Sequence, residues 1–97
     1  MDEEGDLYLR PQRSINTACR TIDQETVIIV LNEQKALILN NTGSRVWGLL
    51  DGKRSIKEIA DTIAKEYLLK PKDAVADVQE FLKSMFSEGA IVWEKDG

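Results

Sequence analysis

The side chains that most often catalyse reactions or hold metal ions are scarce in this chain. Histidine is absent, and Cys19 is the single cysteine among 97 residues. Histidine-dependent triads and the common zinc and haem sites therefore lack their usual residues, and no internal disulfide can form. The acidic residues show no spacing typical of a metal site, and no glycine-rich phosphate loop is present. The sequence therefore predicts a protein that is not an enzyme and needs no cofactor.

The chemistry that the sequence does favour is main-chain hydrogen bonding along an exposed strand. Residues 35–39 read Lys-Ala-Leu-Ile-Leu and are the last of three strand-like runs. In a three-stranded meander this run is an outer strand, whose outward amide and carbonyl groups stay available unless something covers them. An extended peptide can pair with such an edge, while pockets for alternate side chains select its sequence.

Three short segments of strand type precede the helical part of the chain. Residues 15–22 alternate and contain several β-branched residues, residues 26–31 are almost wholly apolar, and residues 35–39 form the third run. Polar breaks at residues 23–25 and 32–34 separate them, which is typical of an antiparallel meander. Residues 26–31 are then the central strand.

Three helices are predicted after these strands. The first follows the polar residues 40–42, the second begins at Ser55 with a capping box and runs to Tyr67, and the third occupies residues 71–88. Residues 90–93 resume as a short terminal strand or extended segment. Strands followed by helices indicate an α+β fold, in which a three-stranded antiparallel β-meander and three helices form a winged helix-turn-helix-like arrangement.

The length and charge of the chain indicate one neutral domain with an acidic start. Residues 1–14 show no sustained periodicity, so we expect a flexible acidic N-terminal arm there and a domain at residues 15–94. Four acids within residues 2–6 account for the net charge of −4. No apolar stretch is long enough to span a membrane, and the start lacks the pattern of a signal peptide. A cytoplasmic protein is therefore expected.

Short motifs follow one another in a set order along most of the chain. The most specific portion is LLDG at residues 49–52, followed by R-S-I-x-E-I at residues 54–59. The other motifs are Leu39-Asn40, Thr42-Gly43, Val46-Trp47, Asp77-Val78, Phe81-Leu82, and Gly89 with Ile91. In this order and spacing, over about residues 15–93, the chain resembles the PqqD family, named for a small protein of pyrroloquinoline quinone (PQQ) biosynthesis.

The resemblance implies a recognition element for ribosomally synthesised and post-translationally modified peptides (RiPPs). Such a domain binds the leader segment of a precursor peptide and presents the peptide to a modifying enzyme, often a radical S-adenosylmethionine (SAM) enzyme, without performing chemistry itself. The resemblance places the binding pockets between the third strand and the third helix. The implied partners are thus a precursor peptide and a modifying enzyme, with no nucleic acid and no membrane.

The candidate peptide-binding residues come from these two elements. The strand supplies Lys35, Ala36, Leu37, Ile38, Leu39 and Asn40, and the helix supplies Val75, Val78, Gln79, Leu82, Lys83 and Phe86. Most of the apolar helix stripe is expected to face the core, so the flank with Val75, Gln79, Lys83 and Phe86 is the part expected at the peptide. A leader with one or two apolar anchors and an acidic residue near Lys83 or Lys35 would suit this groove.

Two other functions fit the same fold. A winged-helix DNA-binding domain would share the helical layout, but its recognition helix should be rich in bases, whereas both long predicted helices are net acidic. A non-catalytic subunit that stabilises a partner enzyme would share the exposed edge. Such a subunit would not bind a free leader peptide in the absence of the partner enzyme, whereas a recognition element would.

Overall fold

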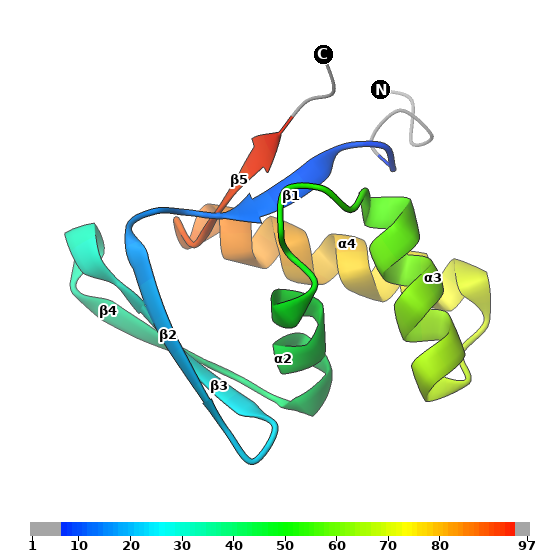
Figure 1. Ribbon diagram of the computed structural model, residues 1–97, viewed down its shortest axis with the longest axis horizontal. Helices are drawn as coiled ribbons and strands as arrows, with labels where there is room; N and C mark the ends of the chain where they lie inside the picture. The colour runs from blue at the N-terminus through cyan, green and yellow to red at the C-terminus, as the bar shows by residue number, and fades with distance from the viewer. Residues whose placement is uncertain (1–6, 95–97) are drawn as a thin grey trace.

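Three runs of β-branched and apolar residues form the antiparallel sheet that the sequence predicts (Figure 1). The computed structural model describes residues 7–94. Strands β2 (Thr17–Ile22), β3 (Glu25–Val30) and β4 (Lys35–Leu39) lie in the order β2-β3-β4, and the 3-10 turn η1 (Leu31–Glu33) joins the last two. Helices α2 (Asn41–Gly48), α3 (Ile56–Tyr67) and α4 (Pro71–Ser87) follow. The predicted α+β order, with β3 as the central strand, is confirmed.

Alternation along β3 gives the sheet one buried and one outer face. Thr26, Ile28 and Val30 are buried, whereas Val27 and Ile29 are exposed. Because side chains alternate across a strand, the first set faces the helices and the second faces away from them. The Thr26 hydroxyl is satisfied by a 2.8 Å hydrogen bond with the Thr21 hydroxyl. The sheet therefore contributes a single face to the core.

The helices supply most of the core. In α3 the Ser55 hydroxyl accepts a hydrogen bond from the Glu58 amide, and the Glu58 carboxylate accepts one from the Ser55 amide, as the predicted capping box requires. Ile59 and Ile63 of α3 are fully buried and belong to the same core as the buried residues of α4. Trp47 of α2 is only 1% exposed, as expected of a core anchor.

The segment before residue 15 differs from the expected arm. Strand β1 (Arg10–Arg13) pairs antiparallel with β5 (Ile91–Glu94), and Pro11 is buried. The prediction of a flexible arm is therefore wrong for Arg10–Arg13, while residues 1–6 lie outside the described part of the chain. A four-residue strand that contains a proline and pairs with the far end of the chain leaves no local pattern in the sequence. The expected terminal strand corresponds to β5.

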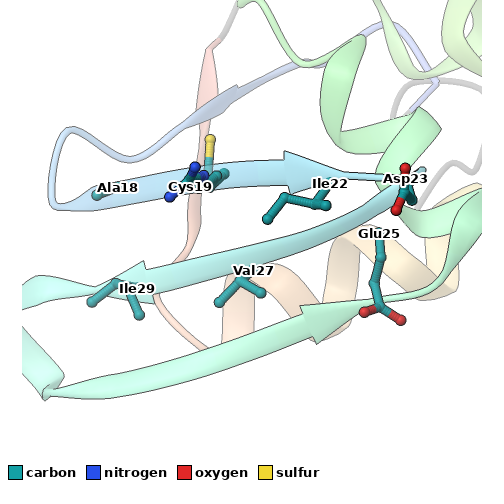
Figure 2. Close-up of a pocket in the computed structure, with 8 residues that line it drawn as sticks. Ala18, Cys19, Ile22, Asp23, Glu25, Val27 and Ile29 are labelled. Carbon is teal, nitrogen blue, oxygen red and sulfur yellow. The ribbon is translucent and has the colours of Figure 1, made fainter.

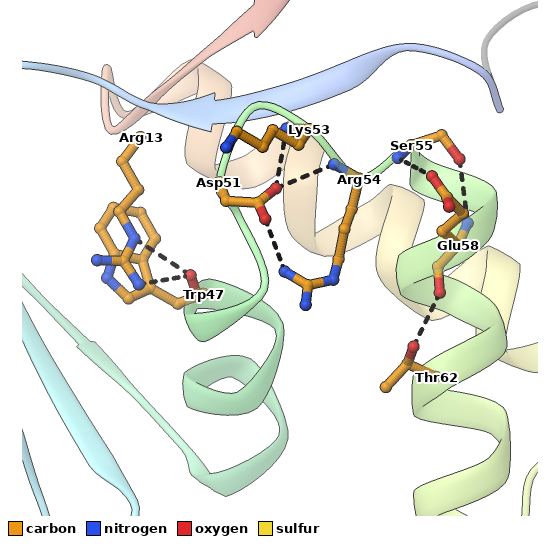
Figure 3. A network of polar contacts seen from close by, with 8 residues as sticks. All are labelled: Arg13, Trp47, Asp51, Lys53, Arg54, Ser55, Glu58 and Thr62. Carbon is orange, nitrogen blue, oxygen red and sulfur yellow. Dashed lines mark hydrogen bonds and ion pairs between the residues drawn. The ribbon is translucent and has the colours of Figure 1, made fainter.

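Polar contacts hold β1 against α2 and order the loop between α2 and α3 (Figure 3). Arg13 donates from Nε and Nη2 to the Trp47 carbonyl at 3.2 and 2.9 Å, and its guanidinium carbon lies 4.9 Å from the centre of the Trp47 ring. In the loop, the Asp51 carboxylate accepts from the Arg54 and Lys53 amides at 2.9 Å each. These bonds lower the pKa of Asp51, the Arg54 amide most strongly. The LLDG motif is thus a structural turn.

Candidate functional site

Strand β4 is an edge of the three-stranded sheet, and within residues 7–94 its only strand neighbour is β3. Leu39 is buried, whereas Ile38 is 71% exposed and Ala36 is exposed as well. An edge strand leaves alternate amide and carbonyl groups without a strand partner. The main chain of β4 is therefore available to a further strand.

A hollow of about 440 Å³ lies where the end of β4 leads into α2 and faces α4. We call it the β4–α4 groove. Its floor is apolar, because the buried side chains Val46, Ile63 and Val78 line it. Asn40, Thr42 and Gly43 line one side, and Asp77, Glu80, Phe81 and Ser84 of α4 line the other. The groove thus combines a strand end, an apolar floor and a polar rim.

One face of α4 forms the helical side of this groove. Asp77, Phe81 and Ser84 recur at the spacing that places residues on one side of a helix. Glu88 follows one turn later and accepts a hydrogen bond from Lys35 Nζ at 2.5 Å, and Glu33 lies 2.9 Å from the same nitrogen. These hydrogen bonds, that to Glu88 first, raise the pKa of Lys35. The start of β4 is thereby joined to the end of α4.

The opposite end of the groove depends on a close approach of α2 to α4. Asn40 caps α2 by accepting a hydrogen bond from the Gly43 amide at 2.8 Å. A Cβ atom at Gly43 would lie 3.1 Å from Asn40 Oδ1 and 3.1 Å from Cε1 of Phe81. A residue without a side chain therefore lets the Phe81 ring lie against the first turn of α2.

Comparison with known proteins assigns the chain to a family. The family model described as "Coenzyme PQQ synthesis protein D (PqqD)" matches residues 14–91, which is most of the chain. The chain belongs to the PqqD family. Among curated proteins, none gives a significant match.

Three solved structures resemble this PqqD family member. TbiB1, solved in complex with the TbiA(beta) leader peptide, is 27% identical, with a TM-score of 0.80, and the match covers 88% of this chain and 99% of TbiB1. A lasso peptide synthetase B1 complexed with the leader peptide is 18% identical, with a TM-score of 0.77 and coverage of 86% and 98%. The PqqD truncation of Methylobacterium extorquens PqqCD, described as a stand-alone RiPP recognition element, is 18% identical, with a TM-score of 0.70 and coverage of 84% and 87%. The last two likenesses concern the fold.

The predicted strand residues lie at the edge as expected, but two of the predicted helix residues are in the core. Asn40 lines the β4–α4 groove directly. Val78 is 1% exposed and contributes to the floor of the groove, whereas Leu82 is fully buried. Leu82 cannot contact a peptide without a rearrangement of the core. It is a packing residue.

The predicted outer flank of α4 faces away from the β4–α4 groove. Val75 and Gln79 line a different hollow, together with Leu7 and Lys57. Phe86 stacks on Trp93 of β5 with 5.7 Å between the ring centres. Lys83 is exposed and does not line the groove. The flank that was expected at the peptide therefore does not line this groove, because periodicity locates an apolar stripe but does not say which of its two borders meets which neighbour.

The sequence analysis missed four groove residues on α4, namely Asp77, Glu80, Phe81 and Ser84. A signal for two of them was present, because Asp77 and Phe81 belong to the motifs that carry the family resemblance. These motifs indicate the family, but they do not indicate that the two side chains line the groove.

A second hollow, of about 650 Å³, lies on the outer face of strands β2 and β3 (Figure 2). Ile22, Val27 and Ile29 line it with Asp23 and Glu25 of the hairpin. It is larger than the groove, but it lies on the outer face of the β2–β3 hairpin, and none of its lining residues comes from a helix. Strand β2 is the other edge of the sheet. We call this second hollow the outer hollow.

Two further properties concern residues 7–94. Within that range no three or more His, Cys, Asp or Glu side chains are grouped so that they could hold a metal ion. None of the helices there is long and apolar enough to cross a membrane.

Proposed function

We propose that this protein binds the leader segment of a ribosomally synthesised precursor peptide and presents the peptide to a modifying enzyme. The observation that carries the proposal is the open edge of β4 beside a groove with an apolar floor. Similar chains that were solved with leader peptides support an extended peptide as the occupant.

The mechanism that fits this geometry is strand addition. The leader would pair its main chain with the edge of β4, and this pairing gives affinity that does not depend on the leader sequence. Alternate side chains of the leader would then point toward α4, where Phe81 and the buried floor residues offer apolar contacts. Full burial of one large apolar anchor contributes roughly 1.5–3 kcal/mol before the cost of ordering the peptide. One or two anchors therefore suffice for selection.

The modifying chemistry belongs, in this proposal, to a partner enzyme in the cytoplasm, and this protein is non-catalytic. One proposed partner is a radical SAM enzyme, as the family resemblance implies, with PQQ biosynthesis as the reference pathway. The other is an enzyme of lasso peptide synthesis, because a lasso peptide synthetase B1 that was solved with the leader peptide shares the fold of this chain. The precursor and enzyme genes beside this gene distinguish the two.

An NMR titration tests leader binding directly. Protein labelled with ¹⁵N is titrated with the synthetic leader of the precursor peptide encoded beside its gene, and a scrambled peptide is the control. We expect saturable shifts at Lys35–Leu39 and at Asp77, Phe81 and Ser84, with no saturable shifts for the scrambled peptide. Shifts centred on Val27 and Ile29 would contradict the proposed site and move it to the outer hollow.

The same titration separates the two alternative functions. If no shift occurs until the neighbouring enzyme is added, the protein is a stabilising subunit and stand-alone recognition is excluded. A titration with random duplex DNA tests the winged-helix alternative, for which salt-sensitive shifts are expected. The net acidity of α3 and α4 favours the absence of such shifts.

A further inference from the structure

The helical side of the β4–α4 groove is acidic and has no neutralising partner in the described chain. Asp77 and Glu80 are exposed on α4 and line the groove. No lysine or arginine within residues 7–94 forms an ion pair with either carboxylate. The residues that line the groove include no lysine or arginine. A bound peptide would therefore meet two unpaired negative charges at the rim.

The one cation on the β4 side of this region is already occupied. Lys35 contacts both Glu33 and Glu88, so its single ammonium group already faces two carboxylates. An acidic leader residue brought to Lys35 would have to approach these carboxylates as well, which is unfavourable. The sequence-based expectation of an acidic leader residue near Lys35 is thus opposed by the charges around it.

The spacing of the groove residues matches the spacing of an extended peptide. Asp77 and Phe81 are four residues apart on α4, which corresponds to about 6 Å along a helix axis. Residues i and i+2 of a strand point to the same side and are about 7 Å apart. In a leader strand that runs along α4, a side chain over Phe81 places the side chain two residues away near Asp77, and Glu80 lines the same groove.

We propose that the β4–α4 groove selects leader peptides that carry a lysine or arginine two residues from an apolar anchor. The anchor lies on Phe81 and the buried floor, and the cationic neighbour pairs with Asp77 or Glu80 at the rim. This inference rests on the proposed function and adds the charge that the leader must carry. Exposed ion pairs are weak individually, so the charge tunes selection and the main chain and the anchor supply most of the affinity.

Single substitutions in a synthetic leader test the charge preference. The probe is the leader of the precursor peptide encoded beside this gene, fluorescently labelled, with each position replaced in turn by lysine and by glutamate. Affinities are measured by fluorescence anisotropy at low ionic strength. At one or two positions we expect the lysine form to bind about two- to fivefold more tightly than the glutamate form. This ratio should fall toward one as salt is added.

Two protein variants of equal charge locate the effect. In the Asp77→Asn/Glu80→Gln variant, the lysine and glutamate forms of the leader should bind with about equal affinity, because the carboxylates that would pair with the leader lysine are gone. The control is Asp23→Asn/Glu25→Gln, which removes the same charge from the exposed β2–β3 hairpin. It should keep the ratio of the unmodified protein.

The outcomes distinguish this inference from the proposed function. If the leader binds but the ratio is the same in the groove variant and the control variant, the charge preference is overturned and leader recognition stands. The charge preference is also overturned if the unmodified protein binds the glutamate forms of the leader more tightly than the lysine forms. If neither the original leader nor any lysine form binds, the proposed function fails, and the inference fails with it.

Discussion

The β4–α4 groove and the outer hollow lie beside the same sheet but offer different chemistry. The outer hollow is the larger, at about 650 Å³ against 440 Å³, and it exposes Ile22, Val27 and Ile29. Its lining residues come from the β2–β3 hairpin alone, where the two strands pair with each other, so a ligand on this face meets mainly side chains. The groove is smaller, yet it combines the end of the edge strand β4 with a wall from α4, which the outer hollow beside the other edge strand, β2, lacks. For recognition of an extended peptide, available main-chain groups outweigh volume.

The largest expected effect comes from truncating the apolar contact of the groove. Phe81→Ala should weaken leader binding about tenfold, or about 1.4 kcal/mol, because a partly buried aromatic ring at the centre of the contact is removed. Val27→Ala removes apolar surface from the outer hollow, and it should leave the affinity unchanged within about twofold. Calorimetric titration of both variants with the leader measures the difference.

The folding of both variants must also be checked, because Phe81 packs against the core and its truncation could destabilise the protein. Thermal melts establish that each variant is folded at the titration temperature. Equal losses of affinity in the two variants would break the distinction between the groove and the outer hollow.

A second prediction separates stability from binding. Ser55→Ala removes the hydroxyl that accepts the Glu58 amide in the capping box of α3, at a site that lines neither hollow. The loss of such a cap costs about 1 kcal/mol of the free energy of unfolding, which is roughly 4–8 °C in melting temperature for a domain of this size. Leader affinity at 25 °C should not change. A parallel loss of affinity would mean that the groove depends on global stability, and the Phe81 result would then need a different explanation.

The sequence predicted the elements well, since each long element carries its own local pattern. Strand β4 and the α3 capping box follow from strand composition and from cap residues. What it could not supply are contacts between distant segments. Two examples are the pairing of Arg10–Arg13 with Ile91–Glu94 and the choice of α4 flank that meets β4.

For the candidate site too, the part that depends on local sequence could be predicted and the part that depends on packing could not. The strand half of the site could be predicted, because an edge position follows from the order of three strands. The helix half could not, because the stripe around Val78 has two borders that look alike in sequence. One leads to Phe81 and the groove, and the other leads to Phe86 and its stacking partner Trp93. Only the packing of α4 against α2 and β5 decides between them.

Replacing each of the two glycines of α2 by alanine should change the stability of the protein in opposite directions, by smaller amounts. A Cβ atom at Gly48 would meet nothing within 4 Å, so Gly48→Ala should stabilise the protein by about 0.4–1 kcal/mol through the unfolded state. Gly43→Ala should lose this gain, because its Cβ atom meets Asn40 and Phe81 at 3.1 Å. It should also weaken leader binding, since the Phe81 ring must shift. Denaturant melts and leader titrations of both variants measure this. Identical behaviour of the two would contradict the close approach of α2 to α4.

The smallest expected effect is a dependence of stability on alkaline pH at the contact between the start of β4 and the end of α4. The hydrogen bonds to Glu88 and Glu33 raise the pKa of Lys35 above its ordinary value of 10.5. A raised pKa means that the folded state binds the proton more tightly than the unfolded state. The stabilisation is therefore complete below pH 10.5 and is lost as the pH rises through the raised value. Lys35→Met should remove this part of the pH dependence, and Lys53→Met, at an exposed lysine outside both hollows, should leave it in place. Urea melts between pH 8 and pH 11 check the difference, and matching profiles for the two variants would show that the link between β4 and α4 adds nothing to stability.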